Sequence, residues 1–255
     1  MSADVLHDLY GLTGGEVIRW IQTPFVEQRR TLYEPSQLTP DGMILLWKDG
    51  ALHPEMFLHG RIGLECLLGV CLGVYFHEME GDIGLVRTPI GGDFVIAEDS
   101  TREQKRSRLA EMLSVSAGKP VKLTLDEVDR SAIVFSGKWT ARGVDGNPIG
   151  DKTQCVHVFG TEFGDTGGGG GRGDIGIFAK SLGERLARHI LVEATDAPSE
   201  VIWRVHSGPR LRKKGEPPPL QLFHIWDVVC NHITDQTGLA WTHATRRVPR
   251  LLIES

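Results

Sequence analysis

The sequence has few cysteines and no excess of positive charge, and both shortages narrow the possible functions. Its cysteines have neither the spacing of a metal site nor the pattern of a disulfide framework: Cys66, Cys71, Cys155 and Cys230. We expect reduced thiols that pack as small apolar side chains. The formal net charge of -5 gives no positive field for a phosphate backbone, so we expect no nucleic-acid partner.

The sequence also lacks an export signal and a membrane-spanning segment. Its N-terminus carries Asp4 where a signal peptide has basic residues and then an apolar stretch. The most apolar run, residues 67–76, is too short to cross a bilayer and has charged residues close by on both sides. The sequence therefore predicts a cytoplasmic protein without a membrane span. An envelope location stays open if the chain is part of a longer protein.

Residues 1–90 predict an N-terminal region made of a helix, a hairpin and a second helix. Thr13 and Glu16 form a capping-box pattern before an apolar stretch, which predicts a helix that stops at Pro24. The Asp-Gly pair at residues 49–50 lies between two apolar runs and favours a tight hairpin turn. A second helix is expected at about residues 62–72.

The rest of the chain predicts an α+β fold, in which one strand–helix–strand–strand unit is used three times. Each unit resembles half of a ferredoxin-like fold. The expected segments are repeat 1 at 91–150, repeat 2 at 151–209, a linker at 210–219 and repeat 3 at 220–255. The expected hairpins pair residues 121–125 with 132–135, 189–193 with 201–205, and 239–242 with 249–254.

Two of these units resemble a known family. Residues 235–239 (Asp-Gln-Thr-Gly-Leu), followed by an extended pair that ends at 251–253, are similar to the short N-terminal domain of secretins and TonB-dependent receptors. Residues 118–121 with 132–135 have a similar pattern. The opening phrase, residues 9–25, resembles the start of uncharacterised bacterial multi-repeat proteins. The resemblance to the receptor domain implies binding of a peptide or protein partner, and not catalysis.

A glycine-rich stretch offers the sharpest alternative, a nucleotide-dependent enzyme. Gly171, Gly173 and Gly176 fit a G-x-G-x-x-G fingerprint before a helix, and Glu193 stands where a ribose-binding acid would fall in an NAD site. The preceding strand is, however, separated from the first glycine by a long glycine-rich segment, and glycine runs produce such matches by chance. We expect 164–173 to be a mobile insertion in repeat 2 and no bound cofactor.

No motif of an activated nucleophile is present in the sequence, and the ten histidines lack metal-ligand spacing. Three tryptophans fall in the later repeats: Trp203, Trp226 and Trp241. Packing in the core or at an edge explains them, while an exposed pair would form a platform for a partner. The sequence thus favours a non-enzymatic binding or assembly protein.

The final strand is the expected partner site. Residues 248–254 end the last repeat, and Pro249 suits an edge position because it cannot donate a ladder hydrogen bond. An edge strand accepts an added strand from another chain. The predicted partner-binding residues are Val248, Arg250, Leu252 and Glu254.

Overall fold

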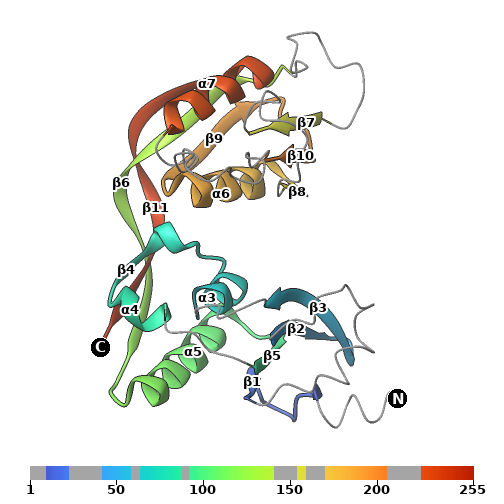
Figure 1. Cartoon of the computed structure of the whole chain (residues 1–255), viewed down its shortest axis with the longest axis vertical. Coiled ribbons are helices and arrows are strands. Elements are labelled where there is room, and N and C mark those ends of the chain that lie inside the picture. Colours follow the sequence, from blue (N-terminus) through green and yellow to red (C-terminus); the bar gives the residue numbers. More distant parts are fainter. Residues whose placement is uncertain are drawn as a thin grey trace, which may run out of the picture. The chain divides into compact units, whose positions relative to one another are not determined.

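The computed structural model describes residues 10–22, 42–58, 64–87, 92–140, 154–158, 170–205 and 225–255. They form a mixed α+β fold, as the sequence predicts (Figure 1). Two compact units are present: unit 1 comprises 1–126 with 249–255, and unit 2 comprises 127–248. The boundaries fall inside two long strands, β6 (Lys122–Lys138) and β11 (Ala240–Glu254). This division differs from the one region and three repeats expected from the sequence.

The main sheet of unit 1 has the strand order β1-β5-β2-β3. Its strands are β1 (Ile18–Ile21), β2 (Gly42–Lys48), β3 (Ala51–Leu58) and β5 (Gly92–Ala97). The predicted hairpin turn between β2 and β3 is confirmed, because Asp49 and Gly50 both have positive φ angles, of 51° and 74°. Strand β5 is buried along its whole length and pairs with β2 in parallel and with β1 in antiparallel orientation.

The helix predicted after Thr13 is wrong, because the chain continues as strand β1. One contact of the capping box forms, because the Thr13 amide donates to the Glu16 carboxylate at 2.7 Å. The second does not: the Thr13 hydroxyl also donates to this carboxylate, and the Glu16 amide donates to the Thr13 carbonyl. The alternating, β-branched stretch that follows instead pairs with β5, and Ile18 enters the core. Burial alone would raise the pKa of Glu16, but hydrogen bonds from Arg19 and Thr13 lower it to about 2.

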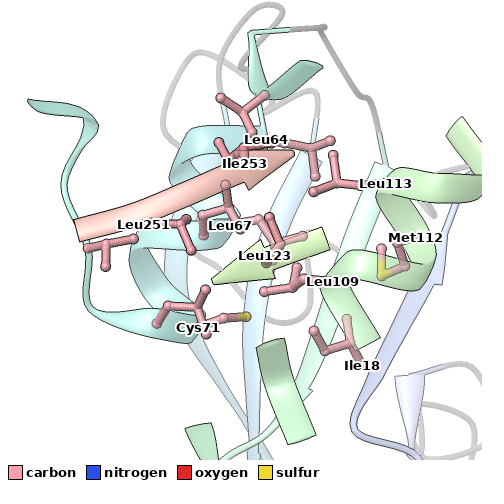
Figure 2. Packing of buried hydrophobic residues seen from close by; sticks show 14 of the residues in the cluster. Ile18, Leu64, Leu67, Cys71, Leu109, Met112, Leu113, Leu123, Leu251 and Ile253 are labelled. Carbon is pink, nitrogen blue, oxygen red and sulfur yellow. The ribbon is translucent and has the colours of Figure 1, made fainter. Parts of the chain in front are cut away.

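The other elements of unit 1 surround a second part of its core (Figure 2). They are α3 (Leu64–Leu72), η1 (Phe76–Glu78), β4 (Met79–Gly81), α4 (Ile83–Val86) and α5 (Arg102–Ala117). Helix α5 begins after the cap Thr101, whose hydroxyl accepts from the Gln104 amide, and ends at the left-handed Gly118. The apolar faces of α3 and α5 pack with Leu123 of β6 and with Leu251 and Ile253 of β11.

Unit 2 contains a three-stranded sheet, two helices, and strand β9 (His189–Thr195) with parts of β6 and β11 from the sheet of order β4-β11-β6-β9. The sheet order is β7-β10-β8, with β7 (Gln154–His157), β10 (Val201–Arg204) and β8 (Gly170–Gly173). Strand β9 runs parallel to β6, and the helices are α6 (Ile175–Leu186) and α7 (Trp226–Thr237). The Gln236 amide ties α7 to β7, because it donates to the His157 carbonyl and accepts from the His157 amide, both at 2.8 Å.

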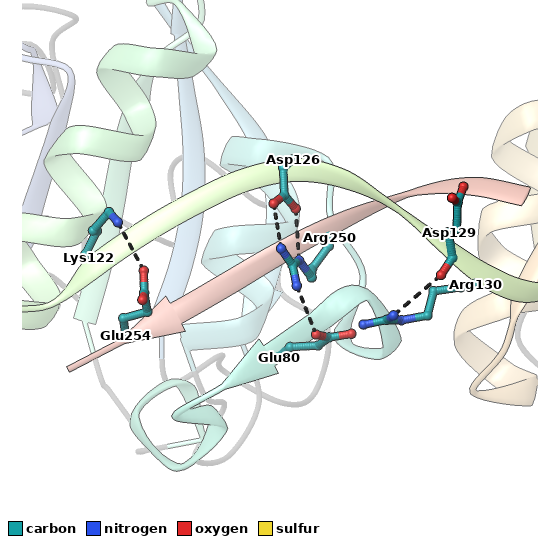
Figure 3. A network of polar contacts seen from close by, with 7 residues as sticks. All are labelled: Glu80, Lys122, Asp126, Asp129, Arg130, Arg250 and Glu254. Atoms are coloured by element: carbon teal, nitrogen blue, oxygen red, sulfur yellow. Dashed lines mark hydrogen bonds and ion pairs between the residues drawn. The ribbon is translucent and has the colours of Figure 1, made fainter.

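All three predicted hairpins are wrong. Residues 122–138 and 240–254 are continuous strands, and β9 and β10 lie in different sheets. The segment from Asp126 to Arg130 resembles a turn because Val128 is its only apolar residue. It forms part of a strand because β11 supplies cross-strand ion pairs, as Figure 3 shows. Asp126 accepts two hydrogen bonds from Arg250, at 2.6 and 2.9 Å, and Lys122 pairs with Glu254 at 3.2 Å.

Several expectations fall outside the described residues. They are the linker at 210–219, the first residues of repeat 3 (220–224) and most of the glycine-rich insertion. The threefold repeat itself stays a prediction. In the part of the chain that the structure describes, no helix is long and apolar enough to cross a membrane.

Candidate functional site

Three aromatic rings gather at the surface of unit 2, and we call them the aromatic cluster. It consists of Trp226 at the start of α7 and of Trp241 and His243 on β11. The ring centroids lie 5.5 Å apart for the two indoles, and the imidazole lies 5.1 Å from Trp226 and 5.9 Å from Trp241. All three pairs meet edge to face. Both indoles are half-buried and His243 is exposed.

The connection between α7 and β11 builds this cluster. Gly238 ends the helix in the left-handed conformation with φ 72°, and a Cβ there would lie 2.1 Å from the Thr140 Oγ1 atom. The chain therefore reverses within two residues and β11 begins at Ala240. Trp241 and His243 are two residues apart on a strand, so their side chains project from the same face.

Polar groups surround the cluster. The guanidinium carbon of Arg188 lies 5.2 Å from the centroid of the Trp226 ring, in a cation–π contact. The Trp241 indole N–H donates to the Asn231 side-chain oxygen at 2.9 Å, which fixes the ring and leaves the Asn231 NH₂ group as a donor. Asp227 and Val228 are exposed in the first turn of α7. The cluster thus combines rigid apolar surface with hydrogen-bond donors at its rim.

Such an arrangement is suited to binding rather than to structure alone. Tryptophan and arginine supply most of the energy at protein interfaces, because they offer large, preorganised contact areas with a polar handle. Trp203 is different: it is 4% exposed and packs at 59° to the Phe178 ring, 5.7 Å away, within the core of unit 2. Trp226 and Trp241 pack against the edge of the same core, as one of the two sequence interpretations has it, and are the pair that keeps part of its surface exposed.

The glycine fingerprint adopts a different structure from the one that a dinucleotide requires. Gly171 and Gly173 lie in β8, which pairs with β10 in antiparallel orientation, so the part of the expected mobile insertion at 170–173 is ordered strand. A Cβ at Gly171 would lie 2.2 Å from the Trp203 ring, and one at Gly173 would lie 2.9 Å from the Ile177 side chain. Packing against these side chains explains both glycines.

The N-terminus of α6 and Glu193, the predicted ribose-binding residue, already have partners within the chain. The Asp174 carboxylate accepts from the Ile177 amide at 2.8 Å, so a negative charge occupies the helix N-terminus where a pyrophosphate would bind. Glu193 forms an ion pair with Arg246 at 2.9 Å, and its pKa is lowered by hydrogen bonds from that guanidinium. Strands β8 and β9 lie in different sheets, whereas a dinucleotide fold has them parallel in one sheet.

The C-terminal strand is not an edge strand, so the expectation that residues 248–254 accept an added strand at an edge is wrong. In unit 1, Leu251 to Ile253 pair with β4, and β6 is the neighbour on the other side. Val248 is buried, Leu252 is half-buried, and Arg250 and Glu254 form the ion pairs described above. The missing signal was β4, a strand of three residues that no periodicity predicts.

The thiols agree with the sequence analysis. Cys71 and Cys230 are buried, and burial raises the pKa of each to about 12, far above the range of a reactive thiolate. Cys66 and Cys155 are half-buried, and all four are free cysteines.

Comparison of this chain with protein-family models, with curated protein sequences and with solved structures finds no match. The site therefore has to be interpreted from its own chemistry. Sequence reasoning found Trp226 and Trp241 but missed three members of the site: His243, Asn231 and Arg188. The two-residue spacing of Trp241 and His243 after a helix-ending glycine could have identified His243.

Proposed function

We propose that this protein is a binding or assembly protein and that the aromatic cluster of unit 2 holds its protein or peptide partner. The observation that carries the proposal is the edge-to-face contact of Trp226, Trp241 and His243 at the surface, with the Arg188 guanidinium over the Trp226 ring. The same class of partner is implied by the resemblance to the short N-terminal domain of secretins and TonB-dependent receptors.

The energetics favour a partner that buries the indoles. Fully burying an apolar side chain contributes about 1.5–3 kcal/mol, and both tryptophans still expose part of their surface. Their orientations are fixed before binding, by the Asn231 hydrogen bond and by mutual ring contacts. A partner therefore gains contact area without a large loss of side-chain entropy in this protein.

Site-specific photo-crosslinking tests the proposal. Two exposed valines form a matched pair: Val228, 53% exposed, lies two residues after Trp226, and Val115, 83% exposed, lies on α5 of unit 1. Peptides are first selected from a random display library on the intact protein. A photoreactive amino acid is then placed at one valine or the other.

We expect the selected peptides to crosslink from position 228 and not from position 115, and the Trp241→Ala variant to abolish the adduct. Equal labelling from both positions, or labelling that survives Trp241→Ala, would place the bound peptides elsewhere. Failure of the library to yield any binder above background would contradict the proposed function itself.

A further inference from the structure

The position of Arg188 indicates which charge the bound peptide carries. This inference rests on the proposed function. The backbone of Arg188 is held just after α6: Ala187 has a left-handed φ of 51°, and the Arg188 amide donates to the Gly183 carbonyl at 3.0 Å. Its guanidinium lies over the Trp226 ring. The side chain is thus anchored at both ends, at its backbone and at its charged group.

The cation–π contact involves the charge of the guanidinium, and within the described part of the chain none of its N–H groups donates a hydrogen bond. Other exposed arginines of unit 2 use these donors within the chain, as Arg172 does with Glu200 and Arg246 with Glu193. Among the described residues, no carboxylate forms an ion pair with Arg188. Its planar fork of donors matches a carboxylate, which it can bind through two parallel hydrogen bonds.

We propose that the aromatic cluster selects an acidic peptide, in which an aromatic or large aliphatic side chain packs on the indoles and an adjacent Asp or Glu binds Arg188. The donors at the rim, the Arg188 guanidinium and the Asn231 NH₂ group, complement a carboxylate. A nucleic-acid strand fits less well, because tracking a phosphate backbone needs several cations along the strand.

Three matched pools of random 12-residue peptides test this selection. Each pool has a fixed central Phe and differs only at one neighbouring position, which is Glu, Gln or Lys. Binding is measured by fluorescence anisotropy with the full chain, with Arg188→Gln and with Arg188→Lys. Arg172→Gln is the control, because Arg172 is also an exposed arginine of unit 2 but pairs with Glu200.

We expect the Glu pool to bind about tenfold more tightly than the Gln pool and the Lys pool to bind most weakly, because two charge-assisted hydrogen bonds depend on the carboxylate. Arg188→Gln should remove the preference for Glu, Arg188→Lys should keep part of it, and Arg172→Gln should not change it. High salt should reduce the preference.

Two results would overturn the selection while leaving the proposed function intact. One is Trp241-dependent binding that does not depend on Arg188. In that case the Glu and Gln pools bind with equal affinity, or the preference for Glu remains in Arg188→Gln. The other is Trp241-dependent binding of a 12-nucleotide oligothymidine that is tighter than that of the Glu pool. If no pool binds in a Trp241-dependent manner, both the selection and the proposed function fail.

Discussion

Replacing Gly171 by alanine tests why this residue is glycine. Either the Trp203 ring leaves no room for a side chain, or a bound dinucleotide requires the glycine. The added Cβ would lie 2.2 Å from Cζ2 and 2.6 Å from Cε2 of the Trp203 ring. Contacts shorter than 3 Å cannot persist, so either the indole or strand β8 has to move. The indole is 4% exposed and contacts Phe178, which leaves it little room. The variant therefore disturbs the core of unit 2.

The expected loss can be bounded from two opposing effects. Overpacking of a core costs about 1–3 kcal/mol. Removal of a glycine from a strand gains back about 0.5–1 kcal/mol, because the unfolded chain loses conformational freedom. Taking the middle of both ranges, we expect Gly171→Ala to lower the free energy of unfolding by about 1 kcal/mol, measured by urea denaturation followed by tryptophan fluorescence.

Gly176→Ala is the matched control, since the fingerprint needs this glycine and the packing does not. Gly176 lies in the first turn of α6, where a Cβ would approach only the Asp174 carboxylate, at 3.1 Å. We expect its stability to equal or exceed that of the natural chain. The packing explanation would be refuted if Gly171→Ala were as stable as the natural chain. It would also be refuted if NAD raised the melting temperature of the natural chain but not of the two variants.

Three further predictions concern stability and reactivity. Gly81→Ala should destabilise unit 1 by about 2–3 kcal/mol in urea, because φ is 88° there and a Cβ would lie 2.2 Å from the Ile253 carbonyl oxygen. Glu16 has a lowered pKa of about 2, so its stabilising effect relative to Glu16→Gln should be complete above about pH 4.5 and should disappear as the pH falls toward 2. A constant difference across that range would contradict this. Cys71 and Cys230 should not react with a thiol reagent at pH 8 until the protein unfolds, because burial raises the pKa of both to about 12.

Local signals in the sequence predicted four of the described helices and failed for the helix expected after Thr13. The apolar spacing of α3, α5, α6 and α7 and the left-handed glycines at 118 and 238 depend only on neighbouring residues. The α+β class follows from the same local patterns. The Thr13 and Glu16 pair shows where local signals stop, since one contact of its capping box forms but a distant strand, β5, decides the conformation of the residues that follow.

Strand pairing could not be predicted, because the partners are far apart in the chain. The Asp126 segment is a strand only when Arg250 lies beside it, more than a hundred residues away. The same limit applies to the candidate site. The sequence indicates Trp226 and Trp241 as single residues. It does not predict the contact of Arg188 with Trp226, because the two residues lie at the ends of different helices.

The affinity of a selected peptide for the Trp241→Ala variant tests the central claim most directly. Trp47, a half-buried tryptophan at the end of β2 in unit 1, provides the control variant Trp47→Ala. Truncating an interface tryptophan typically costs about 2 kcal/mol or more, so we expect at least a roughly thirtyfold weaker Kd for Trp241→Ala and an unchanged Kd for the control. A Kd within about twofold of that of the natural chain, with the variant still folded, would contradict the assignment of the aromatic cluster as the binding site.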